Sequence, residues 1–475
     1  KAARNPELSG EGLAERLAEG AILPMYGMPS RVRLLYHGLR DRKASTMDRD
    51  LDLAVSEFAP GSQRTKDKRV YTAIGFTAPL LYRSGRWVPS EGDPLPGKRW
   101  MSYCERCHYT MTSDAEPSGD TCPNCGNGPD SAYPFRCFKF GVPLGFRTDL
   151  GWGSDARVDS EPLVVTTPVL AESDSAPCEA VSGTNTALGF SESGRVYRVN
   201  TRGGLLFEGA LGRTIRRSGR NQLDLDHQWI DTRYHKQDGN GDMSFVPSGQ
   251  LERLAIVAPK TTDVLRIRPL AVPSGLCLDP AARGGAVKAA YYSAAFILRS
   301  VAAGILDIDP EEIDISSVRW VPLDGKGSHA GEIVINDHLP NGAGFTRWIH
   351  DHWSKVLESI TEPDEEEQGF ASKLISRKHR ESCDSSGYDC LRNYRNMAYH
   401  GLLDWRLGLS LLRCLASDTY QAGLNGAFDD PELDGWLEFA RALRDSFCKS
   451  FASASSCEFG LLPGMEIGSM QVVIT

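Results

Sequence analysis

The sequence has no long apolar run, few cysteines and no excess of positive charge, and each absence excludes a class of protein. No window of the 475 residues approaches the roughly 18 uninterrupted apolar residues of a membrane span, so we exclude a membrane-spanning segment. The 12 cysteines are too sparse for a disulfide-rich scaffold. The net charge of -9 is opposite to that of proteins that bind nucleic acid by charge alone. Contacts with nucleic acid are therefore expected from local basic patches or through a partner.

What remains is the composition of a multidomain globular protein. The sequence is 41% hydrophobic and 24% charged, close to globular averages, and its length suits about two to four domains. From Lys1 onward no basic segment followed by an apolar stretch marks a secretory signal. We therefore expect a cytoplasmic protein.

Common enzyme signatures are also missing. Gly92–Arg99 (GDPLPGKR) nearly matches the phosphate-binding motif G-x-x-x-x-G-K-[ST], but Arg99 replaces the hydroxyl residue and two prolines remove amide donors. No strand ending in Asp-Glu follows as a Walker B motif. G-x-S-x-G and H-E-x-x-H are absent as well. We predict a surface loop at Gly92–Arg99 and expect no ATPase in this chain.

Hydrophobic periodicity predicts an α+β, multidomain architecture. A short amphipathic helix is expected at 8–20, a buried or amphipathic helix at 286–303, and further helices at 402–415 and 437–451. Two strands joined by a basic loop are expected at 51–76, a hairpin around Gly203 and Gly204, and a closing strand at 470–475. We divide the chain into an N-terminal helix plus β region (1–102), a zinc ribbon (103–136), a β-rich region (137–275) and a C-terminal α/β domain (276–475).

The strongest motif is a pair of C-x2-C knuckles separated by 14 residues. Each knuckle turns the backbone so that two thiolates face one point, and two knuckles complete a tetrahedral shell that suits Zn²⁺. A site with four cysteine ligands leaves no open position for water, so we interpret it as structural. A redox pair would need a thioredoxin-like context that is missing. The predicted ligands are Cys104, Cys107, Cys122 and Cys125.

A second cysteine pair lies in the C-terminal part of the chain. Cys383 and Cys390 have His379 just upstream and His400 downstream. Two thiolates and these imidazoles could form a second zinc site. The alternative is a pair of ordinary thiols among helix-capping polar residues, and the spacing alone does not decide between the two.

The most enzyme-like string is NDHLPNGAGF, at 336–345. A glycine-rich turn before a helix exposes amide donors that can hold an anion, and Asp337 and His338 could act as acid or base. The alternative is a tight strand-to-helix turn that needs glycine for positive φ. A metal-dependent nuclease or other hydrolase centred here is thus the alternative function. Three further side chains could contribute to it: His350, Asp351 and His352.

Three basic clusters stand out against the acidic whole. Such loops can neutralise phosphates, although a solvated, salt-bridged surface explains them equally well. The densest, without an acid inside it, consists of Arg213, Arg216, Arg217 and Arg220. The others are Arg64, Lys66, Lys68 and Arg69, and Arg377, Lys378 and Arg380.

Several strings, taken in order, carry a family resemblance. They are ILPMYGMPSRV (22–32), DRDLDLAVSEFAPGS (48–62), the four-cysteine ribbon, NDHLPNGAGF (336–345) and CDSSGYDCLRNYRNMAYHGLLDWRL (383–407). Together they resemble the DrmB family of the bacterial DISARM anti-phage system. They also resemble the C-terminal helicase-associated domain of MrfA-like helicases.

The family's last motif is similar to C-x3-C-Y-x-C-L-x2-Y-x-N followed by a His and an Asp. Gly387 replaces its middle cysteine, which removes a thiolate that His400 or His379 could replace. The positions that match are Cys383, Tyr388, Cys390, Leu391, Tyr394, Asn396, His400 and Asp404. The resemblance implies a non-motor subunit that associates with a DrmA-like superfamily 2 helicase and helps it engage DNA. It implies no catalytic residue.

Overall fold

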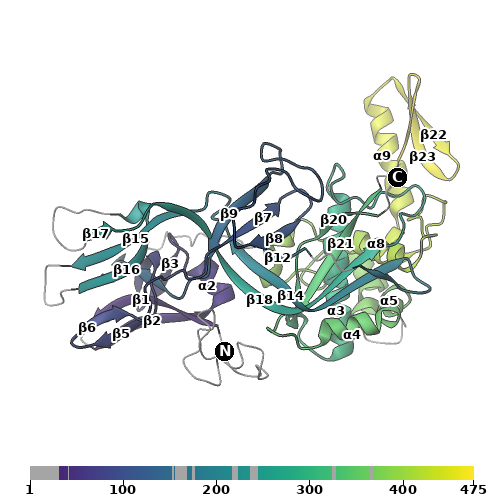
Figure 1. Ribbon diagram of the computed structural model, residues 1–475. Coiled ribbons are helices and arrows are strands. Elements are labelled where there is room, and N and C mark those ends of the chain that lie inside the picture. Colours follow the sequence, from purple (N-terminus) through teal and green to yellow (C-terminus); the bar gives the residue numbers. More distant parts are fainter. Residues whose placement is uncertain are drawn as a thin grey trace.

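Figure 1 shows the computed structural model, in which two lobes are joined by two long strands. The structure describes residues 31–40, 42–151, 154–155, 168–173, 177–216, 223–235, 244–323, 328–363 and 369–474. The helix expected at 8–20, most of the string at 22–32, Arg217 and Arg220 lie outside the described residues.

The two long strands are β14 (Thr186–Asn200) and β18 (Glu252–Pro269). They pair antiparallel from Thr186↔Pro269 to Asn200↔Ile256, with one register shift between Ser191 and Gly194. Both run from one lobe into the other (Figure 1). Most of β18 is buried because it contributes side chains to the cores of both lobes. This confirms the β-rich middle of the chain.

The N-terminal lobe is built around β4 (Arg69–Phe76), which pairs with four other strands. Its core contains the fully buried rings of Phe76, Phe146 and Trp229. The other elements are β1 (Val32–Arg40), β2 (Lys43–Asp50), α2 (Leu51–Glu57), β3 (Gln63–Lys66), β5 (Leu80–Arg83), β6 (Arg86–Pro89), β10 (Phe146–Thr148), β11 (Ser154–Asp155), β15 (Phe207–Arg216), β16 (Leu223–Asp231), η2 (Thr232–Tyr234) and β17 (Ser244–Pro247).

One expected strand of this lobe is a helix instead. The hairpin predicted within 51–76 exists as β3 and β4, joined by a turn in which Asp67 and Lys68 have positive φ. The start of that range, however, forms α2. The Asp50 carboxylate accepts from the amide of Asp52 and caps the helix, and Leu51, Ala54 and Val55 are buried on one face. The expectation of a strand at this point was therefore wrong.

A three-stranded unit lies between the lobes. In it β7 (Arg99–Cys104) pairs antiparallel with β8 (Thr110–Ser113) and β9 (Phe135–Gly141). Strand β9 continues the sheet by pairing in parallel with β18. Two short strands, β12 (Val169–Ala171) and β13 (Glu179–Ala180), add to β14.

The C-terminal lobe packs helices against one face of β14, β18 and β21. Its central helix is α3 (Ala286–Leu306), which confirms the helix expected at 286–303. By length and composition α3 could cross a membrane, but 78% of its most apolar window is buried inside the molecule, as expected of a core helix. The other elements are η3 (Pro310–Glu312), β19 (Ile313–Ile315), β20 (Arg319–Pro322), β21 (His329–Asp337), α4 (Phe345–Asp351), α5 (Trp353–Thr361), α6 (Phe370–Ile375), α7 (Arg377–Ser382), η4 (Tyr394–Tyr399), α8 (Trp405–Ala416) and η5 (Pro431–Leu433).

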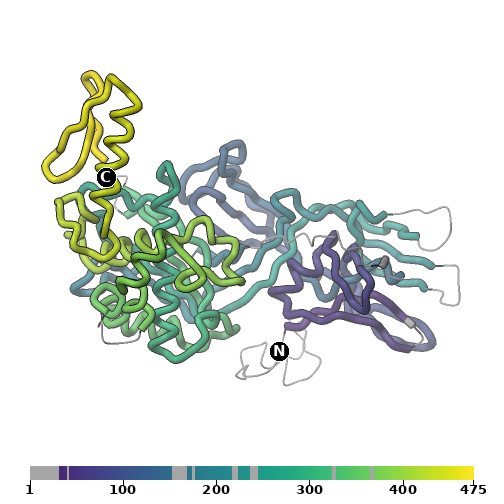
Figure 2. The backbone as a smooth tube through the Cα atoms, turned by 180° about the vertical axis from the view of Figure 1, so that it is seen from behind, coloured from purple at the N-terminus to yellow at the C-terminus, as the bar shows by residue number. Residues whose placement is uncertain are grey.

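The chain ends in a small unit that projects from the C-terminal lobe (Figures 1 and 2). Helix α9 (Trp436–Ser450) packs on a meander of β22 (Ala454–Phe459), β23 (Leu462–Ile467) and β24 (Met470–Val473). The expected last helix and closing strand are both present. Together with the other elements they confirm the α+β class.

Candidate metal centre

Four cysteine thiols meet in the unit between the lobes, and two matching turns position them. The amide of His108 donates to the carbonyl of Cys104 at 2.9 Å, and the amide of Gly126 donates to that of Cys122 at 2.8 Å. His108 and Gly126 have φ of 56° and 68°, so both turns use the left-handed conformation after the second cysteine. The two predicted knuckles therefore share one backbone geometry.

The sulfur positions fit a tetrahedral metal site. The Sγ atoms of Cys104 and Cys125 are 3.6 Å apart, those of Cys107 and Cys122 are 3.5 Å apart, and all four lie within 4.8 Å of one another. A tetrahedral Zn²⁺ with bonds of about 2.3 Å needs sulfur–sulfur separations of about 3.8 Å. Three of the four cysteines are buried. This cluster could hold a metal ion, and its thiolates suit Zn²⁺.

The close packing of the four thiols raises the pKa of two of them, Cys107 and Cys122. Hydrogen bonds with neighbouring thiols, followed by burial, raise the pKa of Cys107, and the pKa of Cys122 is raised to about 11 by its bond with Cys104. Metal binding requires thiolates, so affinity should fall as the pH is lowered.

Hydrogen bonds also connect the cluster to the C-terminal lobe. The amide of Trp320 donates to the carbonyl of Cys107 at 3.2 Å, and Nδ2 of Asn124 donates to the carbonyl of Trp320 at 2.9 Å. Trp320, on β20, packs in one hydrophobic cluster with three of the cysteines. No pattern in the sequence marks this residue, because only the tertiary structure brings β20 beside the knuckles.

Three of the residues proposed for a second metal site also converge. His379, Cys383 and Cys390 place ligand atoms within 4.8 Å of one another, and the two sulfurs are 3.8 Å apart. Nδ1 of His379 donates to the carbonyl of Leu374 at 2.7 Å. That bond places the proton on Nδ1, so the free lone pair of the ring is on Nε2. Nε2 is buried without a hydrogen-bond partner in the described structure. Burial lowers the pKa of His379, which keeps the ring neutral.

The fourth candidate of that site lies elsewhere. Nε2 of His400 contacts the carbonyl of Asn393 at 3.0 Å and Oδ1 of Asn396 at 2.9 Å. His400 is not part of the group in which the ligand atoms of His379, Cys383 and Cys390 come together. Gly387, where the family motif has a cysteine, donates its amide to Sγ of Cys390 at 3.2 Å.

The glycine-rich string at 336–345 is a structural turn. The carboxylate of Asp337 is fully buried and accepts four backbone amides, those of Ala343 at 2.6 Å, Gly344 at 2.7 Å, Phe345 at 3.2 Å and Thr346 at 2.9 Å. The amide donors expected to hold an external anion are thus occupied by the protein's own carboxylate. The hydrolase alternative loses its central group, because this carboxylate cannot reach a substrate.

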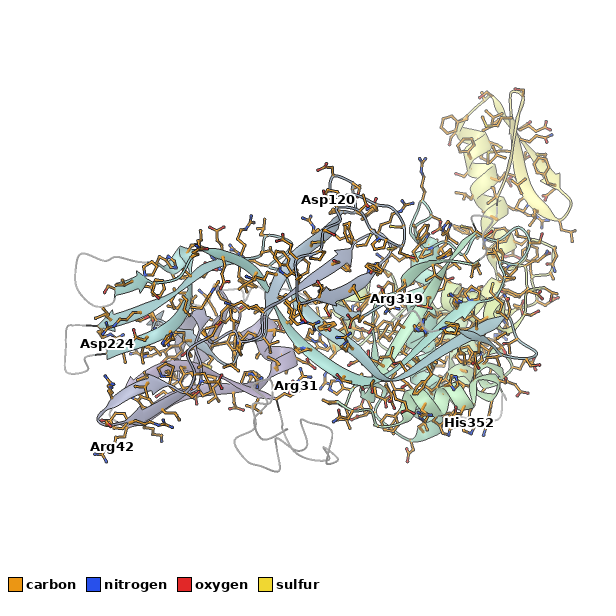
Figure 3. All side chains as sticks on the ribbon, in the orientation of Figure 1. Arg31, Arg42, Asp120, Asp224, Arg319 and His352 are labelled. Atoms are coloured by element: carbon orange, nitrogen blue, oxygen red, sulfur yellow. The ribbon has the colours of Figure 1, made fainter. Side chains whose placement is uncertain are left out.

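The other candidates of the hydrolase alternative do not gather around Asp337. His338 lies against the carboxylate of Asp314, 3.2 Å away, which raises the pKa of the imidazole. His350 pairs with the neighbouring Asp351 at 2.8 Å. His352 stacks on Trp348 and lies on the outer side of the lobe (Figure 3).

The densest basic cluster is partly neutralised across the sheet. Arg213 forms ion pairs with Asp224 and Asp226 of β16, of which Asp224 raises the pKa of the guanidinium. Arg216 donates to the carbonyl of Asp149 at 3.4 Å. Figure 3 labels Asp224 at the tip of the N-terminal lobe. These two aspartates cannot be recognised from the sequence stretch around Arg213, because they lie on the next strand.

The hairpin cluster is neutralised in part as well. Arg64 lies 3.4 Å from the carboxylate of Glu57, and Lys66 donates to the carbonyl of Thr46 at 2.8 Å. The remaining members are Lys68, in the turn, and Arg69, at the start of β4.

In the third cluster two members form ion pairs. Arg377 contacts Glu381 at 2.7 Å, and Arg380 contacts Asp434 at 2.7 Å. Lys378 forms no ion pair with any described residue.

Gly92–Arg99 is a loop, as predicted, but not wholly at the surface, because Leu95 is fully buried in the core of the N-terminal lobe. Nζ of Lys98 lies 2.9 Å from Glu252 and 3.5 Å from Asp93, and the chain continues into β7 rather than into a helix. No helix N-terminus or free lysine is present here to hold a phosphate.

Comparisons with known proteins give limited matches. No protein-family profile matches the chain. A segment of 234 residues, 46% of this chain, is 26% identical to Druantia protein DruE of Escherichia coli (strain UMEA 4076-1) and covers 12% of that protein. The DUF1998 helicase MrfA bound to DNA gives a TM-score of 0.32 at 9% identity, with 81% of this chain and 33% of that chain covered. Its complex with DNA and AMPPNP gives a TM-score of 0.26 at 9% identity, with coverages of 80% and 32%.

Proposed function

We propose that this chain is a non-motor subunit of an anti-phage defence complex of the DISARM type, which associates with a DrmA-like superfamily 2 helicase and helps it engage DNA. The observation that carries the proposal is the ordered set of family strings in the sequence. The similarity to a segment of DruE, a protein of the Druantia anti-phage system, supports a role in defence.

The fold supports a division of labour within such a complex. The one loop that resembles a phosphate-binding motif engages its lysine with Glu252 instead. ATP would then be bound and hydrolysed by the partner helicase. This chain would be a structural component of the complex, which would lie in the cytoplasm. Within the three basic clusters, Lys68 and Lys378 form no ion pair with any described residue, and they join Arg216, Arg217 and Arg220 as the proposed contacts to DNA phosphates.

The metal sites would hold this scaffold together. We propose Zn²⁺ at the four-cysteine cluster and a second Zn²⁺ at His379, Cys383 and Cys390. The first would have a closed, structural shell, and the second would have three protein ligands and one remaining position. Neither site supplies a step of chemistry in this proposal.

Elemental analysis of the purified chain tests both metal assignments. We expect two zinc ions per chain, one of which is lost in Cys122→Ser and the other in Cys390→Ser. Cys277→Ser is the matched control, because Cys277 is exposed and lies outside both groups. A parent chain whose zinc content is unchanged in Cys390→Ser would contradict the distal site, and a parent chain without zinc would contradict both.

Co-purification tests the proposed function itself. The full chain, tagged and co-expressed with a DrmA-like superfamily 2 helicase, should retain that helicase through salt washes. The pair should bind DNA with an affinity that falls as salt rises. The triple variant Arg216→Gln, Arg217→Gln, Arg220→Gln should reduce the salt dependence and keep the helicase bound.

Two controls make this result interpretable. Arg377→Gln removes one charge that is already paired with Glu381, so DNA affinity should change by less than about twofold, in line with the small worth of exposed ion pairs. A chain that never associates with the helicase, with or without DNA, would overturn the proposal.

A further inference from the structure

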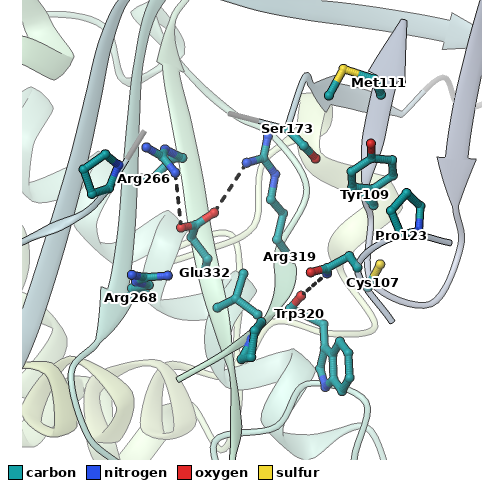
Figure 4. Close-up of a pocket in the computed structure, with 14 residues that line it drawn as sticks. Cys107, Tyr109, Met111, Pro123, Ser173, Arg266, Arg268, Arg319, Trp320 and Glu332 are labelled. Atoms are coloured by element: carbon teal, nitrogen blue, oxygen red, sulfur yellow. Dashed lines mark hydrogen bonds and ion pairs between the residues drawn. The ribbon is translucent and has the colours of Figure 1, made fainter. Parts of the chain in front are cut away.

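A cavity of about 530 Å³ lies between the four-cysteine unit and the C-terminal lobe (Figure 4). Its volume falls within the range of about 300–1,000 Å³ that is typical of small-molecule sites. Tyr109, Met111 and Pro123 line it from the cysteine unit, and the opposite wall comes from β18, β20 and β21. Because the two walls come from sequence positions more than a hundred residues apart, the sequence gives no sign of it.

Two arginines of β18 line the cavity. Side chains alternate along a strand, so Arg266 and Arg268 share one face while Leu265 and Ile267 belong to the core under α3. The neighbouring strand leaves room for them: a Cβ on Gly189 would lie 2.6 Å from Nη2 of Arg266. A glycine at this position therefore lets a buried guanidinium come close to the backbone of β14.

The third arginine is held in place by the backbone. Nη2 of Arg319 donates to the carbonyls of Ala171 at 2.9 Å and Glu172 at 2.7 Å. Among the described residues that line the cavity, Glu332 is the only acidic one. Its carboxylate lies 3.5 Å from Nη1 of Arg319 and 3.9 Å from Nη1 of Arg266.

Arg268 stands apart from this network. It lines the cavity and is half-buried, yet it forms no ion pair and no side-chain hydrogen bond with any described residue. Glu332, its neighbour across the sheet, is already shared by the other two arginines. A guanidinium in this setting can bind a phosphate through two parallel hydrogen bonds.

The remaining walls suit a flat, weakly polar group. Tyr109, Met111 and Pro123 offer apolar surface, and the Ser173 hydroxyl, which accepts from the amide of Thr110 at 3.1 Å, keeps its proton to donate. Trp320 is not available for stacking, because its ring already stacks on another ring at 3.8 Å.

We infer that this cavity binds a nucleoside phosphate, with its phosphate on Arg268 and its base against Tyr109 and Met111. The combination of one unpaired cation, a flat apolar wall and a hydroxyl donor favours this ligand over an inorganic anion, which would use only the cation. The ligand can come from two sources: a free mononucleotide, or a nucleotide of single-stranded DNA. Binding does not require the helicase of the proposed function.

Calorimetric titration of the full-length chain, metal-loaded and without partner, tests the inference. The probes are dAMP, inorganic phosphate and a twelve-nucleotide oligo-dT. We expect dAMP, or the oligonucleotide if the ligand is strand-borne, to bind at least tenfold more tightly than phosphate. Arg268→Gln should weaken that binding at least tenfold, and Tyr109→Leu should weaken dAMP more than phosphate.

Arg253→Gln is the matched control, since Arg253 is on the same strand, far from the cavity, and its side chain is 61% exposed. Circular dichroism and the thermal midpoint establish that each variant is folded. Equal affinity for dAMP and phosphate, no binding at millimolar concentration, or binding unchanged in Arg268→Gln would each overturn the inference. Because Arg268→Gln should still co-purify with the helicase, failure here is distinct from failure of the proposed function.

Discussion

At the residue scale, Asp337 shows how one buried carboxylate can resemble a catalytic group in the sequence. It follows a strand and precedes a glycine-rich turn, a setting in which acids often face a substrate. Here its two oxygens accept the four amides at the start of α4 and leave no lone pair directed to solvent. Its role is to end β21 and to begin α4.

We therefore expect Asp337→Ala to affect stability. Four backbone amides, one of them buried and three partly buried, would lose a charged acceptor, which should cost about 2–4 kcal/mol of unfolding free energy. Asp337→Asn keeps one acceptor oxygen and should cost about half as much. Urea denaturation followed by fluorescence measures both.

Asp351→Ala is the control for this series, because Asp351 ends the same helix with an exposed side chain. It should change the unfolding midpoint little. An Asp337→Ala variant as stable as the parent chain would show that water replaces the carboxylate in the turn.

Several motif residues have equally structural roles. Oδ1 of Asn396 accepts from the amide of Asn393, and its Nδ2 donates to the carbonyl of Leu391. Asp404 caps α8 by accepting from the amides of Arg406 and Leu407. The motif residues thus form a turn that positions Cys390 beside Cys383, whichever ligand completes the site.

At the scale of elements, α3 and α8 pack tightly against each other in the C-terminal lobe. A Cβ added to Gly408 of α8 would lie 2.7 Å from Cβ of Ser293 and 2.8 Å from its carbonyl carbon. The Ser293 hydroxyl accepts from the amide of Asp404 at 2.8 Å and so fixes the start of α8 on α3. The absence of a side chain at Gly408 is what allows the two backbones to approach.

Gly408→Ala should consequently destabilise the C-terminal lobe. The added methyl meets backbone atoms that cannot rotate away, so we expect a loss of about 1–3 kcal/mol. Thermal unfolding measures the loss.

The matched control is Gly304→Ala. Gly304 is an exposed position of α3 with no atom within 4 Å of its added Cβ. That change should be neutral or stabilise by up to about 1 kcal/mol, since alanine favours a helix. If both variants behaved alike, the packing explanation for Gly408 would fail.

At the scale of the whole molecule, the four-cysteine unit connects the two lobes. It shares a sheet with β18 and hydrogen-bonds to Trp320 of β20 through both of its knuckles. A metal ion in this cluster would therefore stabilise the arrangement of the lobes as well as the unit itself.

Removal of the metal by a strong chelator should loosen this connection. We expect amide hydrogen exchange to rise at least tenfold in 103–128 and in β20, because both lose the fixed knuckles. Exchange in α3 should stay unchanged, since its core lies below the sheet. Exchange in β20 that does not respond to the chelator would show that the lobes hold together without the metal.

The sequence by itself determined the α+β class, the core helix at 286–303, the turn of the basic hairpin and the four cysteines that cluster together. These features depend on local periodicity and on short spacings, which act within a few residues. The strand predicted at 51–57 is a helix. There a cap and three apolar residues at helical spacing outweighed the alternation typical of strands.

Only the tertiary structure decided which charged side chains are paired, which groups come together and where a cavity lies. The acids that neutralise Arg213 lie on a neighbouring strand, the amides that occupy Asp337 lie beyond a turn, and His379 rather than His400 reaches the distal sulfurs. The arginine-lined cavity forms between the cysteine unit and strands β18, β20 and β21. Contacts of this kind join residues far apart in the chain, and no local pattern encodes them because each partner is an ordinary residue until the fold brings the two together.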